Sequence, residues 1–378
     1  MAYGRHIDEL TQAVLAREDV VRLLEGADGH PDPQAVKQVH AYINELHTRQ
    51  RYGLYRSLRL PLKLLLRNIK RHVEHIDRPK AATRDTRVIY ASNHRSHVDY
   101  VVQPIVLDDN GIRPPLTAAG INLFGGPLGL LHRHVTGAIP VRRNTKDPVY
   151  LVTLKAWVAE LLSRRDMFVY IEGGRSYSGE LKPPKTGLLH AAMQAELPNV
   201  VVMPVAIAYD LVLEDRALAR QGVKRRQRRF SWELIEMLTL GIGFGTRVFV
   251  TFGEPIPLAG YNHESRRDVL DLAHRTRDAI GRLYKVLPSA LVATAMEPSL
   301  TRADLERRVG DLVGSLAASG ANLAERDAHQ VVHEGLRALR WNGCLRVEAS
   351  RIRVRDRGLL RYYSRSIQHL CSSAPDRT

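Results

Sequence analysis

The sequence predicts an α/β domain between a helical N-terminal region and a small C-terminal module of helices and a β-hairpin. Short apolar runs alternate with helical segments between residues 86 and 258, which is the pattern of an α/β domain. Helical spacing dominates the residues before this stretch, and a hairpin pattern follows the helices after it. We therefore expect a helical region over residues 1–80, an α/β domain over 81–287 and a C-terminal module over 288–378.

The N-terminal region begins with the pattern of two helices. A helix over residues 9–24 is predicted by four apolar residues near helical spacing, Leu10, Val14, Leu15 and Leu23. Prolines at positions 31 and 33 break the chain, and a second helix is predicted from about 34 to 49.

The segment from Leu54 to Ile76 differs because its leucines are interspersed with cations: Arg56, Arg59, Lys63, Arg67, Lys70 and Arg71. Pro61 predicts a kink or a helix start within it. A basic amphipathic segment of this kind can lie on an anionic bilayer, with leucines at the acyl boundary and cations among the headgroups. The alternative is a solvated helix that packs on the core.

Four apolar runs predict the buried strands of the α/β domain, over residues 88–92, 167–171, 200–207 and 248–252. Helices are predicted between them, over residues 98–107, 148–163 and 188–196. Beyond Tyr261 the chain is predicted to be helical to about Ser319. A hairpin over 344–355 and a last helix through Tyr362 and Tyr363 complete a module that resembles a small winged helix.

Composition limits the classes of protein that fit. The 378 residues are 44% hydrophobic, which excludes general disorder, and two cysteines exclude a disulfide framework and a cysteine-rich zinc site. Apolar runs stay below about 18 residues and the start, MAYGRHIDEL, is polar, so we expect a cytoplasmic protein without a transmembrane helix or secretory signal. The net charge of +16 favours anionic partners. The run KRRQRR at 224–229 is a solvated loop or a headgroup contact.

The first motif with chemical potential follows the first strand of the α/β domain, from Asn93 to Asp99. If His94 lies in the turn and Asp99 in the first helical turn, the carboxylate can fix the imidazole tautomer and leave the other ring nitrogen to take a proton. An N-cap with a surface pair is one alternative. A metal site is another, formed by His94 and His97 with His132 and His134. Ser96 is a third, as a nucleophile, but it lacks a Gly-x-Ser-x-Gly elbow.

Two further motifs combine turns with cations. Arg142 and Arg143 end an apolar run and could fork onto a phosphate or form a solvated strand end. The run Glu172, Gly173, Gly174, Arg175 and Ser176 follows another predicted strand, with Lys182 and Lys185 after it. Glycines let backbone N–H groups approach an anion, and these cations add charge, so an anion site is predicted. The Walker pattern is absent.

These motifs resemble the membrane-associated bacterial glycerol-3-phosphate O-acyltransferases of the glycerolipid acyltransferase superfamily. Four blocks stand in the family's order: residues 94–100, 137–143, 172–176 with 184–187, and 202–205. The resemblance covers about 88–258 densely and implies an acyltransferase-type mixed sheet flanked by helices. It further implies that His94 is the catalytic base with Asp99 as its partner. Its implied glycerol-3-phosphate site comprises Arg143 with Arg142, Glu172, Gly174, Arg175 and Ser176.

We therefore expect transfer of a fatty acyl group from acyl-CoA or acyl-carrier protein to the sn-1 hydroxyl of glycerol 3-phosphate, giving lysophosphatidate. No metal or other cofactor is expected. The same residues could use lysophosphatidate or dihydroxyacetone phosphate as acceptor. We expect a peripheral protein at the cytoplasmic face of the cell membrane, bound to its anionic surface. A basic nucleic-acid-binding protein is the alternative from another class; it leaves the Gly-Gly-Arg-Ser motif unexplained, so nucleic acid is not expected as a partner.

Overall fold

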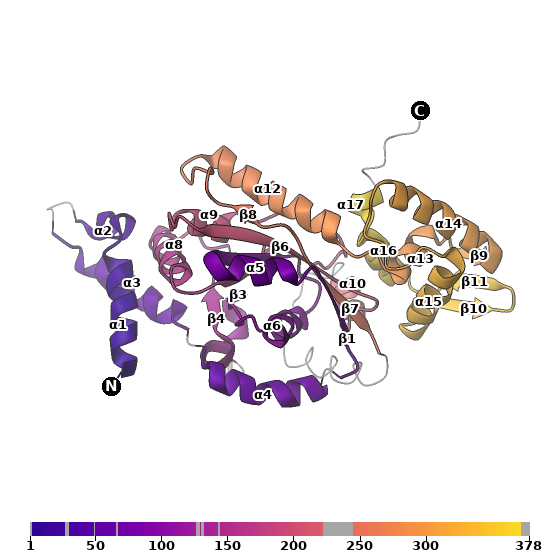
Figure 1. Ribbon diagram of the computed structural model, residues 1–378, viewed down its shortest axis with the longest axis horizontal. Helices are drawn as coiled ribbons and strands as arrows, with labels where there is room; N and C mark the ends of the chain where they lie inside the picture. The colour runs from indigo at the N-terminus through magenta and orange to yellow at the C-terminus, as the bar shows by residue number, and fades with distance from the viewer. Residues whose placement is uncertain are drawn as a thin grey trace.

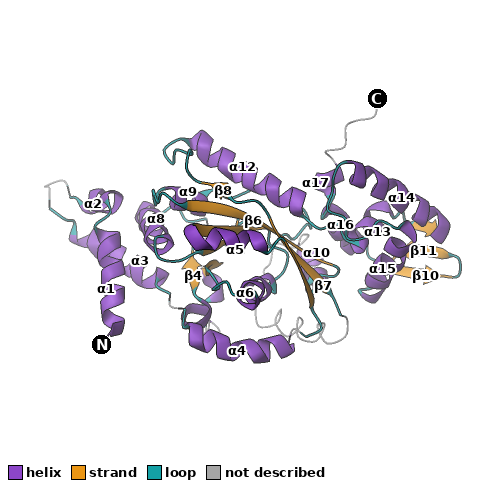
Figure 2. Cartoon of the chain, viewed as in Figure 1, coloured by secondary structure: helices purple, strands orange, loops and turns teal. Residues whose placement is uncertain are grey.

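The centre of the protein is an eight-stranded sheet (Figures 1 and 2). The computed structural model describes residues 2–26, 30–48, 50–65, 67–125, 129, 132–142, 144–221 and 245–371. The strand order is β1-β7-β6-β2-β5-β3-β4, and β8 pairs with β6. The strands are β1 (Lys70–Glu74), β2 (Arg87–Ser92), β3 (Leu116–Gly120), β4 (Ala138–Val141), β5 (Met167–Tyr170), β6 (Val200–Tyr209), β7 (Arg247–Phe252) and β8 (Ile256–Pro257).

The sheet is mixed, as the sequence predicts. Strands β6, β2, β5, β3 and β4 run parallel, β7 runs antiparallel to β6, and β1 runs parallel to β7. All ten positions of β6 are buried, because a strand covered on both faces needs a continuous apolar sequence. The four predicted strands are confirmed as β2, β5, β6 and β7.

Helices cover both faces of the sheet. The three helices predicted inside the domain are confirmed as α6 (Asp99–Asp109), α8 (Pro148–Leu162) and α9 (Gly187–Met193). In Figure 1, α9 and α12 (Arg266–Leu283) lie above the sheet, α8 lies at its left end and α6 lies below it. The short helices α5 (Asp77–Asp85), η1 (Ile121–Leu123), η2 (His132–Thr136) and α10 (Asp215–Gln221) complete this part.

The connections of β2 and β5 determine where a site can form. These two strands are neighbours, but α6 takes the chain from β2 towards β3 and α9 takes it from β5 to β6 in the other direction. Right-handed crossovers then place the two helices on opposite faces. Ligands of open α/β sheets bind beyond the carboxyl ends of strands at such a switch point. The loops after Ser92 and Tyr170 meet there.

The N-terminal region differs in part from its prediction. The helix predicted over 9–24 is two helices, α1 (Ala2–Leu15) and α2 (Glu18–Leu24). Between them Arg17 donates a hydrogen bond to Glu160 of α8 at 3.2 Å, which ties the break to the domain. The second predicted helix is confirmed as α3 (Pro33–Leu46), which also contacts α8.

The basic segment from 54 to 76 is only partly helical. Helix α4 (Tyr52–Leu65) contains Pro61, but residues 70–74 form strand β1, so the helical prediction for those five residues was wrong. Each residue of β1 pairs with one of β7, from Lys70 with Arg247 to Glu74 with Thr251. The sheet therefore starts before residue 81, the predicted beginning of the α/β domain. Within the described ranges, the helices lack the combined length and apolarity needed to span a bilayer.

The C-terminal module contains the predicted hairpin, whose strands β10 (Leu345–Glu348) and β11 (Arg351–Val354) form a three-stranded sheet with β9 (Ser299–Thr301). Its helices are α13 (Pro288–Ala295), α14 (Arg302–Ala318), α15 (Ala328–Trp341), α16 (Arg357–Arg365) and α17 (Gln368–Cys371). Figure 1 shows the module at the end of the molecule opposite α1. A buried network joins it to α10, because the Tyr363 hydroxyl and the Asn342 amide donate to Asp215 at 2.6 and 2.9 Å.

Candidate active site

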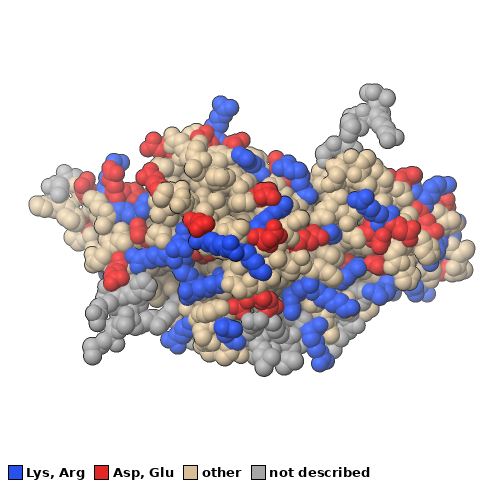
Figure 3. Space-filling model, viewed as in Figure 1, with Lys and Arg blue, Asp and Glu red and all other residues tan. Residues whose placement is uncertain are grey.

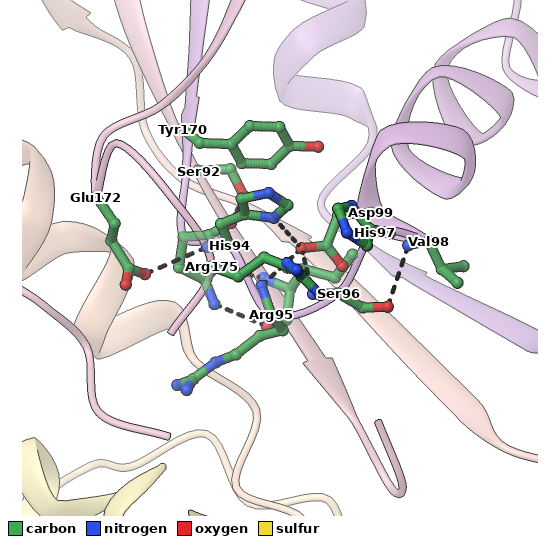
Figure 4. A network of polar contacts seen from close by, with 12 residues as sticks. Ser92, His94, Arg95, Ser96, His97, Val98, Asp99, Tyr170, Glu172 and Arg175 are labelled. Atoms are coloured by element: carbon green, nitrogen blue, oxygen red, sulfur yellow. Dashed lines mark hydrogen bonds and ion pairs between the residues drawn. The ribbon is translucent and has the colours of Figure 1, made fainter. Parts of the chain in front are cut away.

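The loop between β2 and α6 holds His94 against Asp99 (Figure 4). Asp99 is the first residue of α6, where the helix dipole favours a carboxylate. Its Oδ2 lies 2.9 Å from Nδ1 of His94 and accepts the backbone N–H groups of Arg95 at 2.6 Å and Ser96 at 3.0 Å. A carboxylate only accepts hydrogen bonds, so Nδ1 carries the proton and Nε2 holds the lone pair. Asp99 is fully buried, which contradicts a surface pair.

The imidazole of His94 is held on its face as well as at its edge. The ring of Tyr170, at the end of β5, stacks on it with 4.0 Å between centroids and 16° between planes (Figure 4). Burial lowers the pKa of His94 below its usual value, and the hydrogen bond and charge of Asp99 oppose that shift. Arg175 and His97 lower the pKa further through their charges. The ring is therefore neutral at physiological pH, the state that a general base requires.

The loop after β5 is fastened to the His94 backbone. Glu172 Oε1 accepts the N–H of His94 at 3.2 Å, and the N–H of Ser176 donates to the His94 carbonyl at 3.0 Å. Gly173 has a φ of 67°, and a Cβ there would lie 3.0 Å from Cγ of Lys185, so a side chain would be strained and crowded. Two motifs far apart in the sequence thus form one site.

Glu172 is unusual in this loop because its second oxygen, Oε2, is buried without a hydrogen-bond partner among the described residues. Burial raises the pKa of Glu172 to about 7, while the charges of Arg95 and Lys182 oppose the rise. The carboxyl is therefore close to half-protonated at neutral pH and can accept or donate a hydrogen bond at Oε2.

The three cations beside this loop have different surroundings. Arg175 is buried at 4% exposure, and its Nη1 lies 3.3 Å from Oε1 of Glu214. Lys182 Nζ donates to the carbonyls of Arg175 and of Gly174, the latter at 3.2 Å. Lys185 has an exposed side chain. Two of the three cations thus bind protein groups, and Lys185 faces solvent.

Arg142 does not join this cluster. It follows β4, which β3 and β5 separate from β2 in the sheet. Its guanidinium binds Glu45 of α3 through two hydrogen bonds of 2.7 and 2.6 Å. The structure therefore differs from the expected contact with a phosphate, because the guanidinium of Arg142 already binds the carboxylate of Glu45. Arg143 lies outside the described residues, as does the run at 224–229.

The sequence left two alternatives open for this loop, a serine nucleophile and a metal site. Ser96 is fully buried and its Oγ donates to Glu214 at 2.7 Å, so the hydroxyl is bound as part of the loop. Over the part of the chain that the structure describes, no group of three or more His, Cys, Asp or Glu side chains is placed to hold a metal ion.

Comparison with known proteins finds two regions of similarity. Residues 70–208 match the acyltransferase family, and residues 239–374 match the glycerol-3-phosphate acyltransferase C-terminal region. The chain is therefore similar to the acyltransferase family and, beyond residue 239, to the C-terminal region of glycerol-3-phosphate acyltransferases. The first match begins at β1, the strand that the sequence pattern had assigned to a helix.

Individual relatives in the family are longer than this chain. A protein of Mycobacterium tuberculosis named "Putative acyltransferase plsB1" is 30% identical over 87% of this chain and 58% of its own length. Glycerol-3-phosphate acyltransferases of Pseudomonas putida and Aeromonas hydrophila are 34% and 32% identical over 61% of this chain, and the matches cover 29% and 30% of those proteins. The chain therefore spans about three fifths or less of these relatives.

Among solved structures, the 1-acyl-sn-glycerophosphate acyltransferase PlsC of Thermotoga maritima is similar at 16% identity and a TM-score of 0.36. The similarity covers 73% of this chain and 96% of that chain. At this level the similarity says nothing about the site.

Glu214 joins the parts of this site, and no sequence pattern pointed to it. It precedes α10 and is 1% exposed. Its carboxylate accepts from Ser96 Oγ and from the N–H of His97, both at 2.7 Å, in addition to Arg175. It lies in no motif and is 118 residues from Ser96, so only the fold brings the two together.

Two tyrosines were missed for a similar reason. Tyr209, the last residue of β6, donates to Oδ1 of Asp99 at 2.6 Å, and Tyr170 stacks on His94. Both end apolar strands, where an aromatic residue usually indicates core packing. Their position at the carboxyl ends of strands beside β2 is the signal that could have identified them.

Proposed function

We propose that this protein transfers a fatty acyl group from a thioester, acyl-CoA or acyl-carrier protein, to the sn-1 hydroxyl of glycerol 3-phosphate. The contact between His94 and Asp99 is the observation that carries the proposal. It supplies a neutral base whose Nδ1 is oriented by a carboxylate and whose Nε2 makes no hydrogen bond with the described residues.

In this mechanism His94 Nε2 takes the hydroxyl proton as the oxygen bonds to the thioester carbonyl carbon. Asp99 stabilises the imidazolium that forms. The carbon–sulfur bond then breaks, and the thiolate takes the proton from His94. The products are lysophosphatidate and a free thiol. The steps balance with the base and the two substrates, so the proposal includes no metal or other cofactor.

The acceptor's phosphate is proposed to bind at the loop from Glu172 to Ser176, with Lys182 and Lys185. The exposed ammonium of Lys185 is suited to direct contact, and Arg175 adds positive potential from its buried position. Binding of the phosphate there holds the sn-1 hydroxyl within reach of His94. This positioning raises the rate of transfer more than tighter binding of the acceptor would by itself. A contribution from Arg143 remains a prediction from the sequence.

Comparing three acceptors with one acyl donor tests the assignment. Purified protein is expected to acylate glycerol 3-phosphate with a higher kcat/KM than dihydroxyacetone phosphate or lysophosphatidate. Preference for lysophosphatidate would move the proposal to the other branch of the family. Absence of transfer to all three, together with salt-dependent duplex binding, would favour a nucleic-acid-binding protein.

We further propose that the protein binds peripherally to the cytoplasmic face of the cell membrane through α4. The helix exposes Leu54 and Arg56, while Tyr55 is buried against the protein. Apolar and cationic side chains on the outer face suit an anionic bilayer surface. Co-sedimentation with anionic liposomes that weakens at high salt is expected, and its failure at low salt would contradict this proposal.

A further inference from the structure

A second cationic site lies at the opposite end of the sheet from His94. A cleft of about 320 Å³ opens beside the starts of β2, β3 and β5. Its lining comes from α5, β2, the connection to β3 and the turn before β5. The strand β2 spans Arg87–Ser92, about 16 Å, so this cleft is separate from the active site.

Four of the lining residues are arginines: Arg87, Arg113, Arg164 and Arg165. The salt bridges of the described residues include none of these four. The cleft has one carboxylate, Asp166, whose Oδ1 accepts the N–H of Val88 at 3.0 Å. Four cations and one anion leave a formal charge of 4 − 1 = +3.

Two of the four arginines, Arg165 and Arg113, are held in place by protein groups. Arg165 donates to the Gln50 side chain at 2.5 Å and to the Pro114 carbonyl at 3.1 Å. Arg113 lies over the ring of Tyr52, 5.5 Å from its centroid. Burial lowers the pKa of Arg165 to about 10, and the charges of Arg113 and Arg87 lower it further. These cations repel one another, and an anion bound between them would relieve that repulsion.

We propose that this cleft binds a phosphate-bearing anion with two or more negative charges. Guanidinium groups bind phosphate oxygens in pairs, and the volume suits a small ligand or a lipid headgroup. The phosphate can come from a soluble diphosphate or from a phosphomonoester headgroup such as that of phosphatidate. Binding at this cleft does not depend on the proposed acyl transfer.

Further Lys and Arg side chains lie around the cleft. Figure 3 shows Lys and Arg side chains gathered in a band over α5 and α8, the region of the cleft. Exposed Lys80 and Arg84 of α5 belong to this side of the sheet. Tyr52, under Arg113, starts α4, so the cleft adjoins the helix that we propose to lie on the membrane.

The test is titration calorimetry of the full chain with inorganic pyrophosphate, and sedimentation with vesicles of phosphatidylcholine with or without phosphatidate. The variant is Arg87→Gln with Arg164→Gln, because neither side chain makes a hydrogen bond to the described part of the fold. Each lost charged contact weakens binding about tenfold, so a loss of about 10- to 100-fold is expected. The control, Arg326→Gln with Arg361→Gln, removes two exposed charges in the C-terminal module.

Saturable pyrophosphate binding that the variant loses and the control keeps supports a soluble ligand. If the parent binds no pyrophosphate but sediments with phosphatidate vesicles, loss of that sedimentation in the variant and its retention in the control support a headgroup. Pyrophosphate binding equal in the parent and the variant would place the anion elsewhere, including the active-site cations, and would overturn the proposal. Absence of both kinds of binding in the parent would overturn it too. Acyl transfer by the variant is expected to equal that of the parent, which also shows that it is folded.

Discussion

Replacing Asp99 with asparagine separates the charge of the carboxylate from its shape. Oδ2 faces three N–H donors, from His94, Arg95 and Ser96, so the amide oxygen of the variant must take that position. The amide nitrogen then faces the Tyr209 hydroxyl, which can accept as well as donate. The hydrogen bonds can all be kept, and the change that remains is the loss of one negative charge.

The size of the effect follows from the distance. Opposite charges 2.9 Å apart attract by about 5 to 6 kcal/mol at an effective dielectric constant of about 20. The amide dipole recovers part of this, so we expect the barrier to rise by about 3 to 5 kcal/mol. That corresponds to a fall of about 10²- to 10⁴-fold in kcat.

The assay is acyl transfer to glycerol 3-phosphate by purified Asp99→Asn across a range of pH. Because Asp99 opposes the lowering of the His94 pKa, its removal should move the acid limb of kcat/KM to lower pH. Asp85→Asn, an exposed change in α5, is the control and should match the parent. A variant with near-parental kcat and an unmoved acid limb would refute the reasoning.

Three further predictions concern buried polar groups. Glu214→Gln removes the carboxylate beside buried Arg175, so we expect a loss of about 3 to 5 kcal/mol in the free energy of unfolding in urea; unchanged stability would contradict the pairing. Burial raises the pKa of Glu172 to about 7, so the folded protein keeps the proton of this carboxyl to higher pH than the unfolded chain does. The free energy of unfolding of the parent, measured relative to Glu172→Gln, should therefore fall by about 3 kcal/mol between pH 4.5 and 8. A difference that does not change with pH would show that the carboxyl is not desolvated. Tyr363→Phe leaves Asp215 without one donor and should cost about 1 to 3 kcal/mol in urea unfolding, with no loss expected if the hydroxyl is solvated instead.

The sequence predicted the parts of the fold that depend on local pattern. The strand from Val200 is buried throughout, so its apolar run is continuous and easy to recognise. Strand β1 was missed because its sequence, Lys-Arg-His-Val-Glu, has one apolar residue and pairs only at the edge, with β7. Such a strand is stabilised by a partner about 177 positions away, which no local pattern reveals.

In the site, too, contacts between residues close in the sequence could be predicted, and contacts between distant residues could not. His94 and Asp99 are five residues apart, and the turn from strand to helix was enough to place them together. Glu214 required the fold, because its contacts lie 117 and 118 residues away. Arg142 was predicted from its place after an apolar run and from the family resemblance. Its contact with Glu45, in a helix 97 residues earlier, depends on the fold and could not be predicted from local sequence.

The most direct test of the proposed chemistry is acyl transfer to glycerol 3-phosphate by purified His94→Ala, under saturating acyl donor and acceptor. With its base removed, the protein should lose about 10²- to 10⁴-fold in kcat, while His333→Ala, an exposed change on α15, should match the parent. Circular dichroism and urea unfolding would establish that both variants are folded. Transfer by folded His94→Ala at nearly the parental rate would mean that another group moves the proton, and the proposed role of His94 would be wrong.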